Sequence, residues 1–411
     1  MLKKVGIIGS GVAGITLLKA LVDQTEEMTS SQTNNLNLQI VLIERGRNFF
    51  DTFARSPSSN PVVVVHNPVT SRTEYQFFCN QGIKTMSSWI ASLEDRFKTR
   101  IAHKPGLLHL PKNIHEQKKW EDIFNKNSFY QKNIVEKSFL NKKLQKNTIS
   151  DLGIWDPNGF WLNPKKFLIL CLKDVARVFN KGAEILMGTE VRKIKVLDKG
   201  VLLTLRTNDS ESEVVFDKVI MATGSKTEEL LNKNSLYLGD KDGSETKLNL
   251  HTNSGQLSRF AIPKEYYRFF PNFIFCKGGY VTPLIRKAVY SGSSYDKIKN
   301  EDSFLIDKNN KYNFARICNI YNKFSTNIDV SYYRSERCTS SDKLPVVGKI
   351  GSRSDSDLYI FSALASRGFS YGPLLAEILA TEIISEICNS SVENEAASNR
   401  FNQLVTPFRS V

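Results

Sequence analysis

Three glycines near the beginning of the chain have the spacing of a dinucleotide-binding loop. Gly9, Gly11 and Gly14 follow the apolar run 5–8 in the pattern G-x-G-x-x-G, and apolar residues at helical spacing come next. In a strand-turn-helix unit the first glycine permits a tight turn, the second lets the backbone approach a pyrophosphate, and the third lets the helix pack closely on the strand. The N-terminus of that helix presents unpaired N–H groups to an anion. We therefore expect phosphate binding by Gly9, Ser10, Gly11, Val12, Ala13 and Gly14.

A second predicted strand, 39–43, ends in an acidic residue, Glu44, and Glu44 and the following Arg45 are candidate cofactor-binding residues. An acid at this place binds the ribose hydroxyls of the adenosine half of a dinucleotide. Glu44 lies 30 positions beyond Gly14, whereas the fingerprint leads one to expect about 20. The polar stretch 25–37 accounts for the excess if it is an extended surface loop. The cofactor of such a unit is either NAD or FAD.

Two later segments return the chain to the same edge of the expected sheet. The apolar strand 218–221 ends in Ala222, Thr223 and Gly224, and small residues are needed where backbone passes close to a cofactor. In flavoproteins with two dinucleotide domains such a strand returns to the nucleotide, which favours FAD over NAD. Near the C-terminus a small-residue loop precedes a helix that we expect to begin at Pro373. Its candidate cofactor-binding residues are Ala365, Ser366, Arg367, Gly368, Phe369 and Ser370.

Length and composition indicate a globular protein of two lobes. The chain has 411 residues, of which 41% are apolar and 24% charged, enough for two cores. No apolar run approaches the roughly 20 residues that cross a bilayer, so we expect a cytoplasmic protein without membrane attachment. The six cysteines form no C-x-x-C pair, and prolines interrupt the evenly spaced His103, His109 and His115. We therefore expect reduced thiols and no metal site.

The net charge of +14 is concentrated in one segment. Residues 98–146 contain twelve Lys or Arg and four Asp or Glu, interleaved with Trp120, Phe124, Phe129, Tyr130 and Phe139. Cationic and aromatic side chains together favour binding of a nucleic acid. The alternative is a solvated lysine-rich surface with the aromatic rings packed beneath it.

Taken in order, the motifs resemble the FAD-dependent D-amino acid oxidase and glycine oxidase superfamily. Among its branches the chain is most similar to the FAD oxidase domain of the bifunctional enzymes that make 5-methylaminomethyl-2-thiouridine at the wobble position of tRNA. The matching stretches, in register along nearly the whole chain, are 159–164, 279–283 with 292–295, 337–339 with 342–348, and 366–368 with 373–380. The resemblance implies an α/β, Rossmann-like FAD-binding domain and a glycine oxidase-like, α+β substrate domain with a mixed antiparallel sheet.

The resemblance also implies a reaction and its residues. FAD, bound non-covalently, would oxidise the carboxymethyl group of 5-carboxymethylaminomethyl(-2-thio)uridine in tRNA, leaving 5-aminomethyl(-2-thio)uridine and glyoxylate, with oxygen as electron acceptor. Arg337 and Arg367 match positions where the glycine oxidase relatives place arginines near the substrate, and Tyr280 matches a tyrosine of that pocket. A guanidinium binds a carboxylate bidentately and stays charged. These three are the candidate catalytic residues.

Domain boundaries follow from the same comparison. We expect a discontinuous FAD-binding domain at 1–72, 150–226 and 338–411, and a substrate domain at 73–149 and 227–337 that includes the basic segment 98–146. The apolar residues of a helix at 74–97 are expected in the core of the substrate domain. The methyltransferase half of the bifunctional enzymes has no counterpart before the fingerprint, so another protein is expected to supply the methyl step.

Two alternatives stay open at this point. The chain is an oxidase or dehydrogenase of free glycine, sarcosine or a D-amino acid, with its charge incidental. Or it is a flavin-containing RNA-binding protein without turnover, which would suit the passage 54–70, where the small polar pattern expected beside a flavin is not visible.

Overall fold

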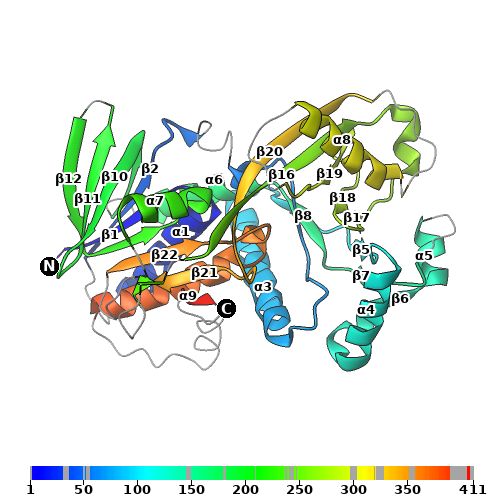
Figure 1. Ribbon diagram of the computed structural model, residues 1–411, viewed down its shortest axis with the longest axis horizontal. Coiled ribbons are helices and arrows are strands. Elements are labelled where there is room, and N and C mark those ends of the chain that lie inside the picture. The colour runs from blue at the N-terminus through cyan, green and yellow to red at the C-terminus, as the bar shows by residue number, and fades with distance from the viewer. Residues whose placement is uncertain are drawn as a thin grey trace.

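The computed structural model describes residues 2–30, 37–49, 51, 56–144, 150–178, 182–208, 210–236, 238–239, 245–246, 248–296, 303–318, 320, 328–350, 357–388 and 405–407. Two lobes lie side by side along the longest axis (Figure 1). One is built on a six-stranded sheet and the other on an eight-stranded sheet. The expected fold class, a Rossmann-like α/β part joined to a part with a mixed antiparallel sheet, is confirmed.

The six-stranded sheet carries the predicted glycine loop. Its strand order is β21-β22-β13-β1-β2-β9, and all neighbours are parallel except the pair β21 and β22. The strands are short apolar runs, as sheets covered on both faces require. Their bounds are β1 Lys3–Ile8, β2 Leu38–Glu44, β9 Ala183–Met187, β13 Lys218–Met221, β21 Val346–Lys349 and β22 Leu358–Ser362.

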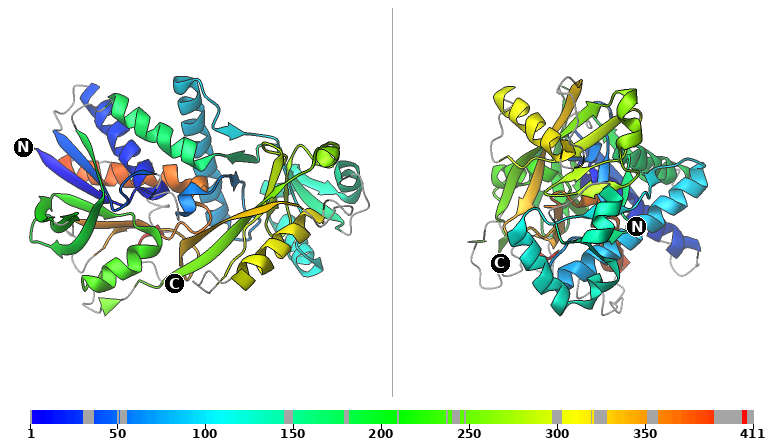
Figure 2. Two further views of the ribbon diagram at one scale, coloured as in Figure 1. Left: turned by 90° about the horizontal axis from the view of Figure 1, so that it is seen from above. Right: turned by 90° about the vertical axis from the view of Figure 1, so that its right-hand side faces the viewer.

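Each face of this sheet is covered by different elements. One face packs against α1 (Val12–Ser30), α3 (Thr73–Phe97), α6 (Pro164–Val178) and α9 (Gly368–Cys388). The other packs against the antiparallel sheet β10 (Thr189–Val196), β11 (Val201–Thr207) and β12 (Ser210–Phe216), together with α7 (Thr227–Lys233). Figure 2 (left) shows helices and three-stranded sheet on opposite sides. The glycine loop is thus held between two cores.

Asp174 on α6 ties three helices together inside this lobe. Its side chain is 1% exposed and accepts hydrogen bonds from Lys19 of α1 (2.7 Å) and from Arg96 of α3. Burial opposes ionisation, but these two hydrogen bonds hold the pKa of the Asp174 carboxyl below its ordinary value. A carboxyl whose pKa is lowered by folding stabilises the protein above its unfolded pKa and loses that contribution as the pH falls.

We expect Asp174→Ala to lower the free energy of unfolding by roughly 2–4 kcal/mol, because Lys19, 8% exposed, keeps only Asp23 as an anionic partner. Urea denaturation at pH 7 measures this. The difference from the unsubstituted protein should begin to shrink as the pH falls below about 4, where the unfolded state takes up the proton, and should vanish once the pH is below the lowered pKa of the folded state. Asp95→Ala is the control, since Asp95 and its partner Lys98 are about 80% exposed and solvent screens such a pair, so it contributes little to stability. An equal decrease of the free energy of unfolding in the two variants would contradict the expectation.

The eight-stranded sheet forms the second lobe in the order β20-β16-β19-β18-β17-β5-β7-β6. Its long strands β16 and β20 pair over eleven positions and run from the middle of the molecule into this lobe (Figure 1). The bounds are β5 Leu107–His109, β6 Ile134–Glu136, β7 Leu152–Asp156, β16 Leu250–Ala261, β17 Ile274–Cys276, β18 Tyr280–Val281, β19 Ala288–Gly292 and β20 Val330–Ser340. Helix α8 (Ser303–Cys318) covers β16 and β19.

The remaining elements are short or peripheral. A small sheet, β3-β8-β4, lies between the lobes, and helices α4 and α5 lie at the end farthest from the N-terminus (Figure 1). Their bounds are β3 Val63–Val65, β4 Ala102–His103, β8 Phe160–Leu162, α4 Ile114–Lys126 and α5 Lys137–Leu144. The others are β14 Leu238–Gly239, β15 Glu245–Thr246, η1 Pro57–Ser59, η2 Ser128–Asn133, η3 Gly224–Lys226 and η4 Lys264–Phe269.

Three sequence-based expectations about helices were wrong. Helix α1 continues to Ser30 instead of giving way to a loop at residue 25, because the hydroxyls of Thr25 and Thr29 donate to the carbonyls four residues earlier; residues 31–36 lie outside the described part. Helix α9 begins at Gly368, so Pro373 stands inside it. The apolar residues of α3 join the core of α1 and α9, where a Cβ at Gly82 would lie 2.5 Å from the Cβ of Tyr371.

The aromatic residues of the basic segment are mainly packing residues. Trp120, Phe124 and Tyr130 are at most 6% exposed and form a core of their own with Ile154, while Phe129 is 39% exposed. The interpretation of these rings as a stacking surface for bases is therefore wrong for three of the five. A charged segment with aromatic residues every few positions is also what a small amphipathic subdomain needs for its own core.

Within the described residues no helix is long and apolar enough to cross a membrane. All six cysteines are free thiols.

Candidate active site

A cleft of about 940 Å³ runs from the glycine loop to the eight-stranded sheet. This is at the upper end of the range of ligand sites. Arg337 and Tyr280 line it from the eight-stranded sheet. The predicted cofactor-binding residues that line it are Gly9, Ser10, Gly11, Val12, Ala13, Glu44, Arg45, Ala222, Thr223, Gly224, Ala365, Ser366, Gly368 and Phe369. Gly14, Arg367 and Ser370 lie behind this surface.

The three glycines of the loop differ in what requires them. Gly9 has φ +102°, and a Cβ there would lie 2.7 Å from the carbonyl oxygen of Ala222; a Cβ on Gly14 would lie 1.9 Å from the carbonyl oxygen of Gly9. These two are needed for the loop to pack. A Cβ on Gly11 meets only the Ser58 hydroxyl at 3.4 Å, an ordinary contact. Protein packing therefore leaves the Gly11 position open toward the cleft, as close approach of a pyrophosphate requires.

Glu44, at the end of β2, is buried against the same loop. Its Oε2 accepts hydrogen bonds from the backbone N–H (2.9 Å) and the hydroxyl (2.8 Å) of Ser10, and its Oε1 accepts from Gly46 N–H (2.8 Å). Each carboxylate oxygen has further lone pairs. Glu44 therefore fixes the loop and still presents acceptors for ribose hydroxyls, which stays a prediction.

The loop before α9 turns through a left-handed conformation at two alanines. Ala363 has φ 56° and Ala365 φ 51°, and Ala365 N–H donates to the carbonyl of Cys338. Positive φ is uncommon for non-glycine residues and occurs mainly where function demands it. This geometry directs the first residues of α9 at the cleft. Burial raises the pKa of the adjacent Cys338 thiol, which keeps it protonated and suits the expected non-covalent binding.

One part of the cofactor end was missed from the sequence. The helical turn η1 lines the cleft with Pro57 and Ser58, and the Ser58 hydroxyl accepts a hydrogen bond from Val12 N–H at the beginning of α1 (2.9 Å). The passage 54–70, where the small polar pattern expected beside a flavin was not visible, thus contributes a wall of the cleft. Residues 52–55 lie outside the described part. The available signal was the short group of Ser56, Ser58, Ser59 and Asn60 around Pro57.

Arg337 lies at the other end of the cleft, 5% exposed. Its Nη2 donates to the Ser293 hydroxyl (2.7 Å), and Tyr295 places its ring 4.8 Å from the guanidinium carbon. A Cβ at Gly255 would lie 2.2 Å from this guanidinium, so glycine is needed beneath it. In the described part of the chain Arg337 has no ion pair with a carboxylate. A buried cation without an anion is costly unless a ligand supplies one.

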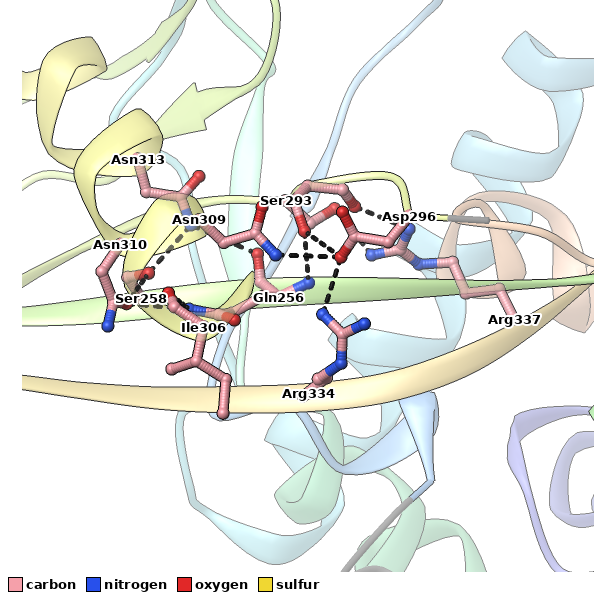
Figure 3. A network of polar contacts seen from close by, with 11 residues as sticks. Gln256, Ser258, Ser293, Asp296, Ile306, Asn309, Asn310, Asn313, Arg334 and Arg337 are labelled. Carbon is pink, nitrogen blue, oxygen red and sulfur yellow. Dashed lines mark hydrogen bonds and ion pairs between the residues drawn. The ribbon is translucent and has the colours of Figure 1, made fainter. Parts of the chain in front are cut away.

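A polar network holds the segment that supports Arg337 (Figure 3). Asp296 accepts hydrogen bonds from Arg334 (2.6 Å), from Asn309 of α8 (2.9 Å) and from Ser294 (3.1 Å). The carbonyl of Ser294 in turn accepts from Arg337 (3.4 Å). The segment is therefore clamped between α8 and β20, which fixes the direction of the guanidinium.

The other two candidate catalytic residues occupy different places. Tyr280 is on β18 and lines the cleft beside Arg337; burial raises the pKa of its phenol, which therefore stays protonated. Arg367 is half-buried and donates to the carbonyl of His66 (3.3 Å). Burial and the charge of Arg367 lower the pKa of His66 to about 4. The structure brings Arg337 and Tyr280 together, while Arg367 lies behind the loop that it belongs to.

This arrangement suits the expected cofactor and substrate. The glycine loop, Glu44 and the N-terminus of α9 would hold FAD, which supplies hydride-accepting chemistry that side chains lack. Arg337 would bind a carboxylate at the opposite end. No group of three or more His, Cys, Asp or Glu side chains suited to a metal ion occurs among the described residues.

Comparisons with known proteins agree with this description. The model of the family "FAD dependent oxidoreductase" matches residues 4–382. Over 422 aligned residues the chain is 22% identical to the tRNA 5-methylaminomethyl-2-thiouridine biosynthesis bifunctional protein MnmC of Pseudoalteromonas atlantica, which covers 92% of this chain and 56% of that protein. The chain thus spans about half the length of this relative.

Solved structures share the fold at low sequence identity. Iminodiacetate oxidase from Chelativorans sp. BNC1 superposes with a TM-score of 0.73 at 14% identity, over 98% of this chain and 99% of that one. Glycine oxidase from Geobacillus kaustophilus gives a TM-score of 0.70 at 14% identity, over 96% of each chain. The family model matches nearly the whole chain, and the cleft with its glycine loop agrees with that match. The protein therefore belongs to the FAD dependent oxidoreductase family.

Proposed function

We propose that this FAD-dependent oxidoreductase acts on the CH–NH group of an N-substituted glycine, the carboxymethylaminomethyl group of a wobble uridine in tRNA. The observation that carries the proposal is Arg337, a buried guanidinium that lines the cleft without a carboxylate partner. An N-carboxymethyl group supplies the missing anion. The overall change would be R–NH–CH₂–COO⁻ + H₂O + O₂ → R–NH₂ + OHC–COO⁻ + H₂O₂, with oxygen as the proposed acceptor.

The chain's own residues would position and shield the reacting group. Arg337 would bind the carboxylate through two N–H groups, which fixes the adjacent CH₂ relative to the cofactor end of the cleft. The protonated Tyr280 phenol, whose O–H donates to the carbonyl of Val62 (3.4 Å), would shape the same wall and present its oxygen as a hydrogen-bond acceptor. No side chain is required as a base, since an amine in its neutral form loses hydride directly. Arg367 would keep the loop before α9 in place through the carbonyl of His66.

A tRNA substrate is supported by charge and by the relative from Pseudoalteromonas atlantica, whose name assigns it to tRNA 5-methylaminomethyl-2-thiouridine biosynthesis. The exposed face of α4 carries Lys118 and Lys119, and α5 carries Lys142, with no ion pairs among the described residues. Cationic side chains of this kind bind phosphates in a salt-dependent manner. A separate methyltransferase would complete the modification.

A second candidate is oxidation of free glycine derivatives. It is favoured by the burial of most aromatic residues in the basic segment and by the structural neighbour titled iminodiacetate oxidase. Iminodiacetate is itself a glycine with a second carboxymethyl group on nitrogen, so the same Arg337 would serve it.

Anaerobic mixing separates the two candidates. We expect stoichiometric tRNA that bears 5-carboxymethylaminomethyluridine to bleach the flavin absorbance and to release one glyoxylate per uridine, because its carboxylate reaches Arg337. Glycine and sarcosine at millimolar concentration are expected to leave the flavin oxidised. The matched control is the same tRNA with unmodified uridine. Bleaching by the small molecules alone would replace the tRNA proposal with the second candidate.

A further inference from the structure

The face of the eight-stranded sheet that carries Arg337 continues outward beyond the cleft. Residues directly opposite each other in neighbouring strands share a face, and alternate residues along one strand do so too. Tyr333 lies four positions from Arg337 on β20, an even number, so the two share a face. Asn253 on β16 is the partner of Arg337, and Arg259 lies six positions from Asn253, so Arg259 shares that face too. Tyr290 on β19 is the partner of Arg259. All four side chains therefore lie on one face.

Helix α8 covers the opposite face of these strands. Ser258, between two residues of the first face, donates to Asn310 of α8 (2.7 Å) and accepts from Asn313 (2.8 Å). Tyr332 is opposite Ser258 and so lies on the α8 side. The two neighbouring tyrosines of β20, Tyr332 and Tyr333, thus point to different faces, although their exposed fractions are similar at 43% and 39%.

Aromatic and cationic groups meet on the first face. Arg259 makes a side-chain hydrogen bond with Tyr290, and Tyr333 and Arg286 lie close enough to influence the titration of Tyr290. Burial is the main reason that the pKa of the Tyr290 phenol is raised. The phenol therefore remains neutral. Arg259 and Arg286 form no ion pair with a carboxylate of the described chain. We name Arg259, Arg286, Tyr290 and Tyr333 the outer cluster.

The outer cluster lies on the same sheet as Arg337, beyond the residues that line the cleft. At about 3.4 Å per residue, the four positions from Arg337 to Tyr333 correspond to roughly 14 Å along β20. A substrate whose carboxylate is held by Arg337 and which is larger than an amino acid extends from the cleft toward solvent. A polynucleotide would bring phosphates and bases beyond the reacting uridine. Unpaired guanidinium groups suit the phosphates, and half-exposed rings suit the bases.

We propose that the outer cluster binds a ribonucleotide adjoining the reacting uridine, with Arg259 and Arg286 on its phosphate and Tyr333 stacked on its base. This inference rests on the proposed tRNA substrate and adds a second contact to it, separate from the lysines of α4 and α5. An acidic peptide would use the guanidinium groups but gain little from the neutral rings. The combination therefore favours RNA over a protein partner.

Three variants test the outer cluster: Tyr333→Ala, Arg259→Ala and, as matched control, Tyr332→Ala. Each is assayed as holoenzyme with modified tRNA and with the free nucleoside 5-carboxymethylaminomethyluridine, which lacks neighbours. Binding of an unmodified anticodon stem-loop, followed by fluorescence anisotropy at several salt concentrations, gives a readout that does not depend on turnover.

We expect Tyr333→Ala to weaken stem-loop binding about tenfold and to raise the KM for tRNA by a similar factor, since one base loses its stacking partner. Arg259→Ala should also weaken stem-loop binding. The slope of the logarithm of the binding constant against the logarithm of the salt concentration should become shallower by about one, as the loss of one phosphate contact requires. Oxidation of the free nucleoside should be unchanged in both, and Tyr332→Ala should match the unsubstituted protein in every assay.

The outcomes distinguish this inference from the proposed function. If modified tRNA and nucleoside both reduce the flavin but Tyr333→Ala and Tyr332→Ala behave alike, the outer cluster is not an RNA contact. If Tyr333→Ala slows the free nucleoside as much as tRNA, its effect is on the catalytic site and the inference is wrong. If neither modified substrate reduces the flavin, the proposed function fails instead; stem-loop binding that is lost in Tyr333→Ala alone would still support the cluster.

Discussion

Replacing Arg337 by alanine is expected to lower kcat/KM for the carboxymethylamino substrate by about 10²–10³-fold, since losing one partner of a buried charge pair costs 2–5 kcal/mol. The guanidinium is 5% exposed and has no other anion in the described chain. The loss should appear mainly in binding of the carboxylate group. A non-oxidisable thioether analogue, in which sulfur replaces the substrate nitrogen, measures this directly through the flavin absorbance.

Two controls make the Arg337 result specific. Arg337→Lys keeps the charge but not the fork of parallel N–H groups, so it should recover only part of the affinity. Arg268→Ala removes an exposed guanidinium of the same lobe and should change nothing. An Arg337→Ala protein that binds the thioether analogue with unchanged affinity would show that another residue holds the carboxylate.

Substitutions at two glycines of the same loop are expected to have different effects, one on FAD binding and the other on stability. Gly11→Val should give a folded protein that purifies without FAD, with at least a 100-fold weaker Kd, or about 2.7 kcal/mol. A Cβ at this position makes only an ordinary contact with the protein, while the valine side chain would occupy the place expected for the pyrophosphate. Gly14→Ala should instead destabilise the fold by at least about 3 kcal/mol, because its Cβ would lie 1.9 Å from the carbonyl oxygen of Gly9.

Absorbance at the flavin band and thermal unfolding of the apoproteins separate the two effects. Gly372→Ala is the matched control, since a Cβ there makes only an ordinary contact of 3.6 Å with Val12. It should keep both FAD and stability. A Gly11→Val protein with full flavin content would contradict the assignment of this loop to the phosphates.

The family and cofactor were predictable because local patterns encode them. A G-x-G-x-x-G loop between strand and helix requires only residues close together in sequence, and the structure supplies the reason at Gly9 and Gly14. The strand ending at Ala222 and the loop at 363–370 were placed at the cleft for the same reason, since carboxyl ends of parallel strands share one edge of a sheet.

Helix ends and the partners of long helices were not predictable in this way. Residues 25–30 resembled part of a loop, yet the hydroxyls of Thr25 and Thr29 bond back to the helix. Pro373 resembled the beginning of a helix, yet α9 begins five residues earlier. The apolar stripe of α3 showed that one face is buried but not which core receives it. Periodicity reports burial and carries no information about the partner.

The sequence by itself determined the family and the glycine loop, and it proposed the candidate arginines, because these depend on motifs that are contiguous or nearly so. Only the tertiary structure decided that Arg337 lines the cleft while Arg367 turns toward His66, and that Tyr333 shares a face with Arg337 while Tyr332 does not. The physical reason is that strand register and loop conformation set the direction of each side chain, and both arise from contacts between residues far apart in the chain.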